Sequence, residues 1–202
     1  MTVHSAQDAV DKRDKRERIL AAAERIFARH GFFAAKVSDV AKEAGVADGT
    51  IYLYFKNKDD LLVSIFDRSM RGAIAEGQAM AGDVSDPRER LRRFAALHLG
   101  RLGRDRNLAV VFQVELRQST KFMERFSSTL LRDYLGLIRD AIADGQRAGT
   151  FRADINATVA AKMFFGALDE MATNWILSRR RYSLEADADA IVDLFVNGAR
   201  AR

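Results

Sequence analysis

The sequence predicts an all-α fold of about nine helices, and three observations lead to this prediction. The 202 residues contain a single proline, so long stretches lack the residue that most strongly interrupts helices. Alanine, leucine, arginine and glutamate, which favour helices, are abundant. Apolar residues recur at helical spacing along most of the chain. We therefore expect helices throughout and no strands.

The N-terminal part predicts a tail followed by three helices. Residues 1–11 have no periodic apolar face, which indicates a disordered tail. In KRERILAAAERIFARHG (15–31), apolar residues share one face, and Gly31 stands where a left-handed cap ends a helix. A short apolar stripe in VSDVAKEAG (37–45) predicts a second helix, and a third follows a tight turn at about 48–55.

The remaining chain predicts six further helices. Asn57 can cap a long helix that ends near residue 81, because an acidic residue, Asp60, stands at its third position. Asp86 and Pro87 form a strong start signal for the next helix, to about residue 102. The other expected helices are 107–118, 122–147, 155–180 and 184–199, the last capped by Ser183.

Composition excludes several classes of function. The chain has no cysteine, which excludes disulfides and thiolate metal sites. Its three histidines, His4, His30 and His98, are isolated, so we expect neither a metal site nor a catalytic residue. No apolar run approaches the roughly 20 residues of a membrane span, and no leader is evident. We expect a cytoplasmic protein without enzymatic activity, a resident cofactor or a membrane partner.

The formal charge of +5 invites a nucleic-acid interpretation, but it is not concentrated near the N-terminus. Residues 1–60 carry 11 Lys and Arg against 10 Asp and Glu, a difference of 11 − 10 = +1. Overall charge therefore decides nothing, and only the local basic run KRDKRER (12–18) and two lysines near residue 57 stand out.

Two short helices joined by a glycine-bearing turn match the helix-turn-helix pattern, whose second helix enters the major groove of DNA. At 100° per residue, Ile51 and Phe55 point to one side, and Thr50, Leu53 and Tyr54 point to the other. Hydroxyls and an apolar side chain on the outer side suit phosphates, base edges and thymine methyls. The residues alone leave open whether this pair of helices binds DNA or packs within a helical protein.

GFFAAKVSDVAKEAGVADGTIYLYFKNKDDLL (31–62) resembles the N-terminal domain of the tetracycline-repressor (TetR) family over its whole length. The resemblance implies a homodimer whose two recognition helices read a palindromic DNA operator. It divides the chain into a tail (1–11), a helix-turn-helix domain (12–57) and an effector-binding and dimerisation domain (58–202). The DNA-binding residues that it implies are Lys36, Ser38, Gly49, Thr50, Tyr52, Leu53, Tyr54 and Lys58.

Two positions depart from the family pattern. Ala47 stands where the family often has a serine that caps the recognition helix, so Asp48 is the alternative at that end. Lys36 occupies a position that is commonly threonine, and it adds either a phosphate contact or only a solvated charge.

NLAVVFQVELRQS (107–119) and FFGALDEMATNWILS (164–178) are similar to the TetR-type FadR repressors of fatty-acid degradation. This resemblance implies that long-chain acyl-CoA is the effector and that its binding releases DNA. Apolar bulk and helix-end arginines are compatible with it, but the same residues suit an ordinary core. The expected effector-binding residues are Phe94, Leu97, His98, Arg101, Val111, Phe112, Glu115, Phe122, Phe126, Phe164 and Leu168.

Two rival hypotheses remain: a TetR-type regulator of another hydrophobic ligand, and a helical binding protein without DNA function. Helix 155–180 carries two apolar stripes, which suggests one partner within the subunit and one across a dimer axis. Asp169 and Glu170 interrupt these stripes and meet either arginines of the interface or polar groups of the pocket. The expected dimer-interface residues are Phe165, Ala172, Ile176, Ile191 and Phe195.

Overall fold

The computed structural model describes residues 2–82, 84–118, 122, 124, 129–178, 180 and 182–199, with side chains from Val10 onward. Within these residues nine α-helices and two short 3-10 helices form the fold and no strand occurs, which confirms the predicted class. The elements are α1 (Thr2–His30), α2 (Val37–Ala44), α3 (Asp48–Tyr52), α4 (Lys58–Gly82), α5 (Pro87–Arg104), α6 (Arg106–Gln113), η1 (Glu115–Gln118), α8 (Thr129–Arg147), α9 (Ala157–Leu177), η2 (Leu184–Asp187) and α10 (Ala188–Ala199).

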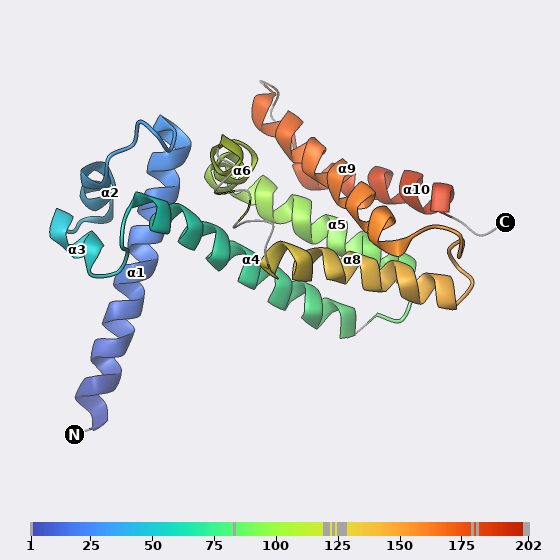
Figure 1. Cartoon of the computed structure of the whole chain (residues 1–202), viewed down its shortest axis with the longest axis horizontal. Helices are drawn as coiled ribbons and strands as arrows, with labels where there is room; N and C mark the ends of the chain where they lie inside the picture. Colours follow the sequence, from blue (N-terminus) through green and yellow to red (C-terminus); the bar gives the residue numbers. More distant parts are fainter. Residues whose placement is uncertain are drawn as a thin grey trace.

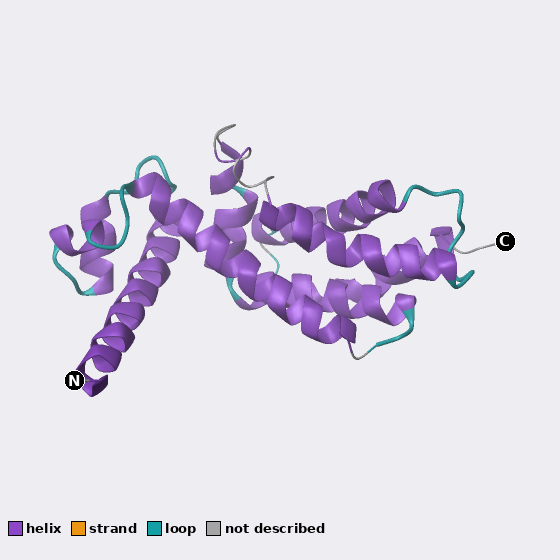
Figure 2. Ribbon diagram, turned by 60° about the horizontal axis from the view of Figure 1, so that its bottom comes forward, coloured by secondary structure: helices purple, strands orange, loops and turns teal. Residues whose placement is uncertain are grey.

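The helices form two parts of unequal size. Helices α1, α2 and α3 make a small head at one end, and α5, α8, α9 and α10 make a longer bundle (Figure 1). Helix α4 begins against the head and runs into the bundle, so it belongs to both parts (Figures 1 and 2). Helix α6 packs against α1 and α9, which gives the head and the bundle a second connection.

Helix α1 is longer than the sequence predicted. It begins at Thr2, whereas residues 1–11 were expected to form a disordered tail. The extra turns project away from the rest of the molecule (Figure 1). Their sequence contains no glycine or proline, so no residue in them interrupts a helix.

Most predicted helix ends are confirmed. Gly31, Gly45 and Gly149 all adopt positive φ angles, between 66° and 75°, which a residue with a side chain rarely takes. The Asn57 side chain accepts a 2.9 Å hydrogen bond from the Asp60 amide, as an N-cap should. Ser183 precedes η2, but its side chain makes no capping hydrogen bond, so that part of the prediction is wrong.

Several predicted helices have different bounds. Helix α3 ends at Tyr52 rather than near residue 55, and α9 spans Ala157–Leu177 rather than 155–180. The helix expected at 107–118 is α6 followed by the 3-10 turn η1, and the helix expected at 184–199 begins as η2. Helix α8 is described from Thr129, and residues 122 and 124 before it are also helical. The break after α6 has a tertiary cause, because the first residue of η1 makes a buried hydrogen bond to the head.

Helix packing in the bundle depends on close approach at two glycines. A Cβ at Gly77 of α4 would lie 2.5 Å from a methyl carbon of Leu137 on α8. A Cβ at Gly145 of α8 would lie 2.2 Å from the ring of Phe151, which is buried after the turn that follows α8. These two positions let α8 lie directly against its neighbours.

Candidate functional sites

The helix pair α2–α3 is anchored as the sequence predicted. Ile51 and Phe55 are 1% and 2% exposed and pack into the head with Val40. The Arg16 guanidinium of α1 lies 5.2 Å from the centre of the Phe55 ring, a cation–π contact. Because α3 is only five residues long, these apolar contacts rather than its own hydrogen bonds hold it in place.

The opposite side of α3 faces away from the protein. Tyr52 is 58% exposed and Leu53 is 77% exposed, whereas Thr50 and Tyr54 are half-buried. Tyr54 therefore lies partly against the core, where the sequence predicted an outward orientation. Large exposed apolar residues are costly in water unless another surface covers them, so this side has the character of an interface.

Residues around α3 extend this surface. Gly49 is exposed, and a Cβ there would meet nothing within 4 Å, so the glycine leaves space for a partner outside the chain. Lys36 and Ser38 are exposed at the start of α2. Phe33, in the loop before α2, is 62% exposed and also belongs to this surface. The sequence did not predict this, because an apolar residue is usually expected to be buried. Neither Ala47 nor Asp48 caps α3 through a side chain.

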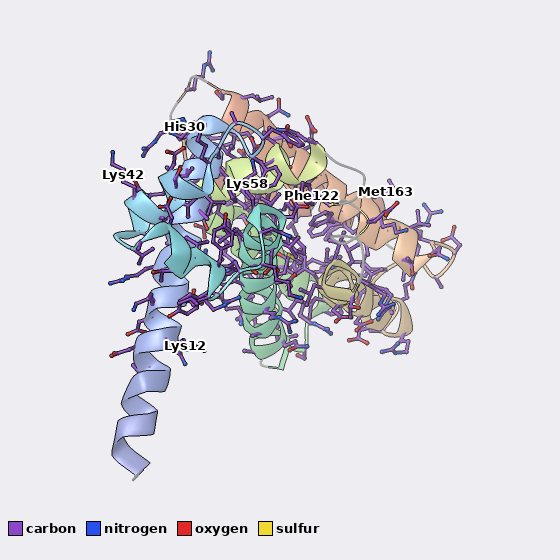
Figure 3. All side chains as sticks on the ribbon, turned by 60° about the vertical axis from the view of Figure 1, so that its left-hand side comes forward. Lys12, His30, Lys42, Lys58, Phe122 and Met163 are labelled. Carbon is purple, nitrogen blue, oxygen red and sulfur yellow. The ribbon has the colours of Figure 1, made fainter. Side chains whose placement is uncertain are left out.

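Lys58 has a structural contact that the sequence did not predict. Its ammonium donates 3.0 Å hydrogen bonds to the carbonyls of Phe33 and Ala35 and lies 4.7 Å from the centre of the Phe32 ring. The side chain is half-buried between the head and the bundle (Figure 3). Two of its three N–H groups therefore bind the chain itself and join α4 to the head, and the expected contact with a DNA phosphate stays a prediction.

A pocket lies among α4, α5, α6, α8 and α9, and its internal volume is about 40 Å³. Its wall is mainly apolar, and polar side chains from several of these helices also line it. The lining residues are Ser69, Met70, Ala73, His98, Arg101, Leu102, Leu108, Phe112, Gln113, Arg117, Leu131, Tyr134, Phe165 and Asp169.

His98 is the most unusual polar group of the pocket wall. It is 9% exposed, and its Nδ1 lies 3.0 Å from the hydroxyl oxygen of Tyr134. Burial lowers the pKa of His98 to about 4 and raises the pKa of Tyr134, so both groups are neutral at pH 7. Within the described residues His98 Nε2 has no hydrogen-bond partner, which leaves one buried polar atom in the pocket wall available to a ligand.

Asp169 accepts hydrogen bonds from the other polar side chains of the pocket wall, Gln113 and Arg117. Its carboxylate accepts hydrogen bonds from Gln113 at 2.8 Å and from Arg117 at 2.5 Å. Thr173 donates to the Gln113 side-chain oxygen at 3.1 Å. Of the two alternatives left by the sequence, Asp169 meets polar groups of the pocket, whereas Glu170 accepts a hydrogen bond from Asn174 on its own helix.

The structure brings only some predicted effector residues to the pocket. His98, Arg101 and Phe112 line it, whereas the other predicted residues that the structure describes do not. Phe94 packs on Tyr134, with 4.8 Å between ring centres, behind the pocket wall. Those that lie elsewhere in the core or between helices are Leu97, Val111, Phe164 and Leu168, while Phe126 lies outside the described residues.

Glu115 and Phe122, also predicted to bind effector, lie at the junction with the head. The Glu115 carboxylate, 4% exposed, accepts a 2.6 Å hydrogen bond from the backbone amide of Phe32. The Phe122 ring meets the Phe32 ring edge-on at 5.1 Å (Figure 3). Both residues therefore connect the chain segment after α6 to the loop that precedes α2.

The residues predicted for a dimer interface differ in their burial within the single chain. Ala172 is fully buried and Ile176 is 8% exposed, and Phe165 lines the pocket, so these three face other parts of the same chain. Ile191 and Phe195 are half-buried, and their contact with a second copy stays a prediction. A third side of α9 is exposed together with part of α10. Its large apolar residues are Val159, Met163, Leu177 and Leu194, between 53% and 76% exposed; Figure 3 labels Met163 on the outer side of the bundle.

The described residues form neither a cluster of metal ligands nor a membrane span. Among the residues that the structure describes, no group of three or more His, Cys, Asp or Glu side chains could hold a metal ion. The same part of the chain contains no helix that is long and apolar enough to span a membrane.

Family models match nearly the whole chain. Residues 19–65 match the family described as "Bacterial regulatory proteins, tetR family". Residues 66–198 match the family described as "YsiA-like protein, C-terminal region". The two matches meet in α4, the helix that connects the head to the bundle.

Individual relatives agree with the family models. The "Fatty acid metabolism regulator protein" of Bacillus subtilis (strain 168) is 36% identical over 187 residues, 93% of this chain and 96% of that protein. The solved structure of the fatty acid degradation regulator FadR of Bacillus halodurans is 37% identical, with a TM-score of 0.85, and the match covers 91% of this chain and 99% of that one. FadR of Bacillus subtilis in complex with stearoyl-CoA is 34% identical, with a TM-score of 0.86 and the same coverage.

Proposed function

Because the chain belongs to the TetR family of bacterial regulatory proteins, we propose that it represses genes of fatty-acid degradation and leaves its operator when it binds long-chain acyl-CoA. One observation carries the proposal: the outward face of α3 lies at one end of the molecule, and a mainly apolar pocket lies beside α4, the helix that follows α3. The relative solved with stearoyl-CoA and the relative that regulates fatty acid metabolism support this choice of effector.

DNA binding is assigned to the exposed side of the head. Tyr52 and Leu53 meet base edges or thymine methyls, and Lys36, Ser38 and Thr50 meet phosphates beside the groove. The protein acts in the cytoplasm as a homodimer, because two copies of α3 are needed to read a palindromic operator.

The dimer forms through the exposed side of α9 and α10. Val159 and Met163 on α9 and Leu194 on α10 are large apolar side chains that a second copy would cover. Two helices from each subunit would form a four-helix bundle, which is a stable way to bury such faces. Ile191 and Phe195, which the sequence predicts at the interface, are half-buried on the same helix as Leu194.

The effector binds in the pocket between α4 and the bundle. A volume of about 40 Å³ is far smaller than the roughly 300–1,000 Å³ of pockets that hold drug-sized ligands. A long acyl chain therefore enters only if the helices separate. Ser69, Met70 and Ala73 form the α4 part of the wall, so separation moves α4.

Movement of α4 reaches the head through Lys58. This residue begins α4 and holds the carbonyls of Phe33 and Ala35, so the loop before α2 follows the helix. The distance between the two α3 helices of the dimer then changes. Because each α3 helix must enter the major groove of its own half-site, this change removes contacts in both half-sites.

A DNA-shift assay with acyl-CoAs of increasing chain length tests the proposal. Long-chain acyl-CoA should release the operator, whereas short-chain acyl-CoA and free CoA should not. Release by none of the chain lengths would favour a regulator of another hydrophobic ligand.

The second rival, a protein without DNA function, is tested by salt. A protein that neutralises about 6–10 phosphates loses roughly 10³ to 10⁵ in affinity for DNA between 50 and 200 mM salt. Operator affinity that stays constant over this range would support the rival.

A further inference from the structure

Three charged side chains meet where the head joins the bundle. The Glu24 carboxylate of α1, 6% exposed, accepts a 2.8 Å hydrogen bond from Arg68 of α4. The Asp105 carboxyl group, between α5 and α6, lies within hydrogen-bond reach of the Glu24 carboxyl group. Two carboxyl groups can form a hydrogen bond with each other only when one of them carries a proton. We call Glu24, Arg68 and Asp105 the junction triad.

The junction triad connects α1 to two sides of the internal pocket. Arg68 directly precedes Ser69, which belongs to the α4 part of the pocket wall. Asp105 joins α5 to α6, and its side chain caps α6 by accepting a 3.1 Å hydrogen bond from the Leu108 amide. Leu108 lines the pocket on the side of α6. A ligand that forces α4 away from α6 therefore also draws Arg68 away from Asp105, and Glu24 cannot follow both.

Further charges from α1 and α2 act on the triad. Glu17 of α1 also accepts a hydrogen bond from Arg68, at 3.3 Å, so the guanidinium is shared between two carboxylates. Arg25 of α1 attracts the Glu24 carboxylate less than Arg68 does, and its guanidinium is bonded to Glu43 of α2 at 2.7 Å. The attraction that keeps Glu24 ionised is therefore divided.

The two charge states of the triad favour different arrangements. With a proton on Glu24, its carboxyl group donates to Asp105 and accepts from Arg68, so α1 holds α4 and α6 together. Without this proton, two carboxylates repel each other at a buried junction, and only the contact with Arg68 remains. Burial and then Asp105 raise the pKa of Glu24 to about 7, so both charge states are populated near neutral pH.

We propose that the junction triad is a proton-dependent latch: a proton shared by Glu24 and Asp105 holds the internal pocket in its narrow form, and widening of the pocket by the effector releases this proton. This inference rests on the proposed function. A group that binds a proton more tightly in the narrow form than in the widened form makes effector binding stronger as the pH rises. For the same amount of effector, the protein therefore keeps its operator more firmly at acidic than at alkaline pH.

The test is the release of a fluorescently labelled operator by stearoyl-CoA, measured by anisotropy at pH 6 and pH 8. The wild-type dimer should need roughly three- to tenfold less stearoyl-CoA for half-release at pH 8, because the latch loses its proton between these two values. E24Q imitates the protonated state, since its amide donates to Asp105 at any pH. This variant should need similar concentrations at both pH values. The phosphates of stearoyl-CoA titrate equally in both experiments, so the difference between the two proteins isolates the latch.

D105N is the second variant, because asparagine caps a helix about as well as aspartate and offers an amide donor to Glu24. It should also lose the dependence on pH. D86N is the matched control, since Asp86 caps α5 by accepting a 3.0 Å hydrogen bond from the Arg88 amide and lies outside the triad. Its ratio between the two pH values should equal that of the wild type.

Thermal melting at both pH values establishes which variants are folded, and if E24Q is unfolded, D105N decides alone. A folded variant with the same ratio as the wild type would overturn the latch while leaving the proposed function intact. Failure of stearoyl-CoA to release the operator from the wild type at either pH would refute the proposed function and the latch together.

Discussion

Glu24 of α1 and Arg68 of α4 form a partly buried ion pair at 2.8 Å between the head and the bundle. Arg68 also reaches Glu17 of α1 at 3.3 Å, and Asp105 is close enough to repel the Glu24 carboxylate. Burial first, and then Asp105, raise the pKa of Glu24 to about 7, against the opposing attraction of Arg68. Burial is thus the main cause of the raised pKa, and Glu24 takes up a proton near neutral pH.

This shift predicts that stability depends on pH. A carboxyl group whose pKa is higher in the folded state than in the unfolded state binds more protons when folded, between about pH 4.5 and pH 7. Its contribution to stability is therefore present below pH 4.5 and is lost as the pH rises through 7. Thermal unfolding at pH 5 and pH 7.5 should show a smaller decrease in melting temperature for Glu24→Gln than for the wild type. Equal decreases would contradict the assignment.

Tyr52→Ala should abolish operator binding without unfolding the protein. Tyr52 is 58% exposed, so its removal costs little core packing. Ile51→Ala is the contrasting variant, because Ile51 is 1% exposed and its truncation should cost about 2–5 kcal/mol of stability. DNA-shift assays and thermal melting separate the two effects. A large decrease in the melting temperature of Tyr52→Ala would show that this ring belongs to the core.

Glu115→Gln should weaken the coupling between effector and DNA. The carboxylate binds the Phe32 amide, and a neutral amide oxygen forms a weaker hydrogen bond at the same place. We expect the variant to bind acyl-CoA normally but to need a higher acyl-CoA concentration for release from the operator. Gln118→Ala is the control, since Gln118 contacts Glu115 but not the head. An identical release curve for Glu115→Gln and the wild type would refute this role.

Gly145→Ala should destabilise the bundle by about 1–3 kcal/mol, because a methyl group there would lie 2.2 Å from the buried Phe151 ring. Gly82→Ala should have little effect, since a Cβ at Gly82 meets nothing within 4 Å. Urea unfolding at equilibrium measures both free energies. A Gly145→Ala variant as stable as the wild type would mean that the ring moves aside without cost.

Leu194→Asp should convert the dimer to a monomer and abolish operator binding. Leu194 is 76% exposed in the single chain, and a charge there would have to be buried at the interface. Val10→Asp, an exposed apolar residue of α1, should leave the dimer intact. Analytical ultracentrifugation at micromolar concentration compares the two variants. A dimeric Leu194→Asp protein would place the interface elsewhere.

The sequence alone determined the helical class, most helix ends and the orientation of α3. These features depend on local rules: Gly31 and Gly45 accept left-handed angles, Asn57 caps α4, and helical periodicity places Ile51 and Phe55 on the buried side. These interactions join residues that are only a few positions apart, so the local sequence is enough to predict them.

Only the tertiary structure decided which side chains meet across helices. Phe164, Phe165 and Ala172 are all apolar residues on α9, yet one lies in the core beside α10, one lines the pocket and one is buried where an interface was predicted. Lys58 and Glu115 are charged residues whose partners are backbone groups of a distant loop. The sequence shows which face of a helix is apolar, but it does not show which other helix covers that face. The packing of the whole chain decides this.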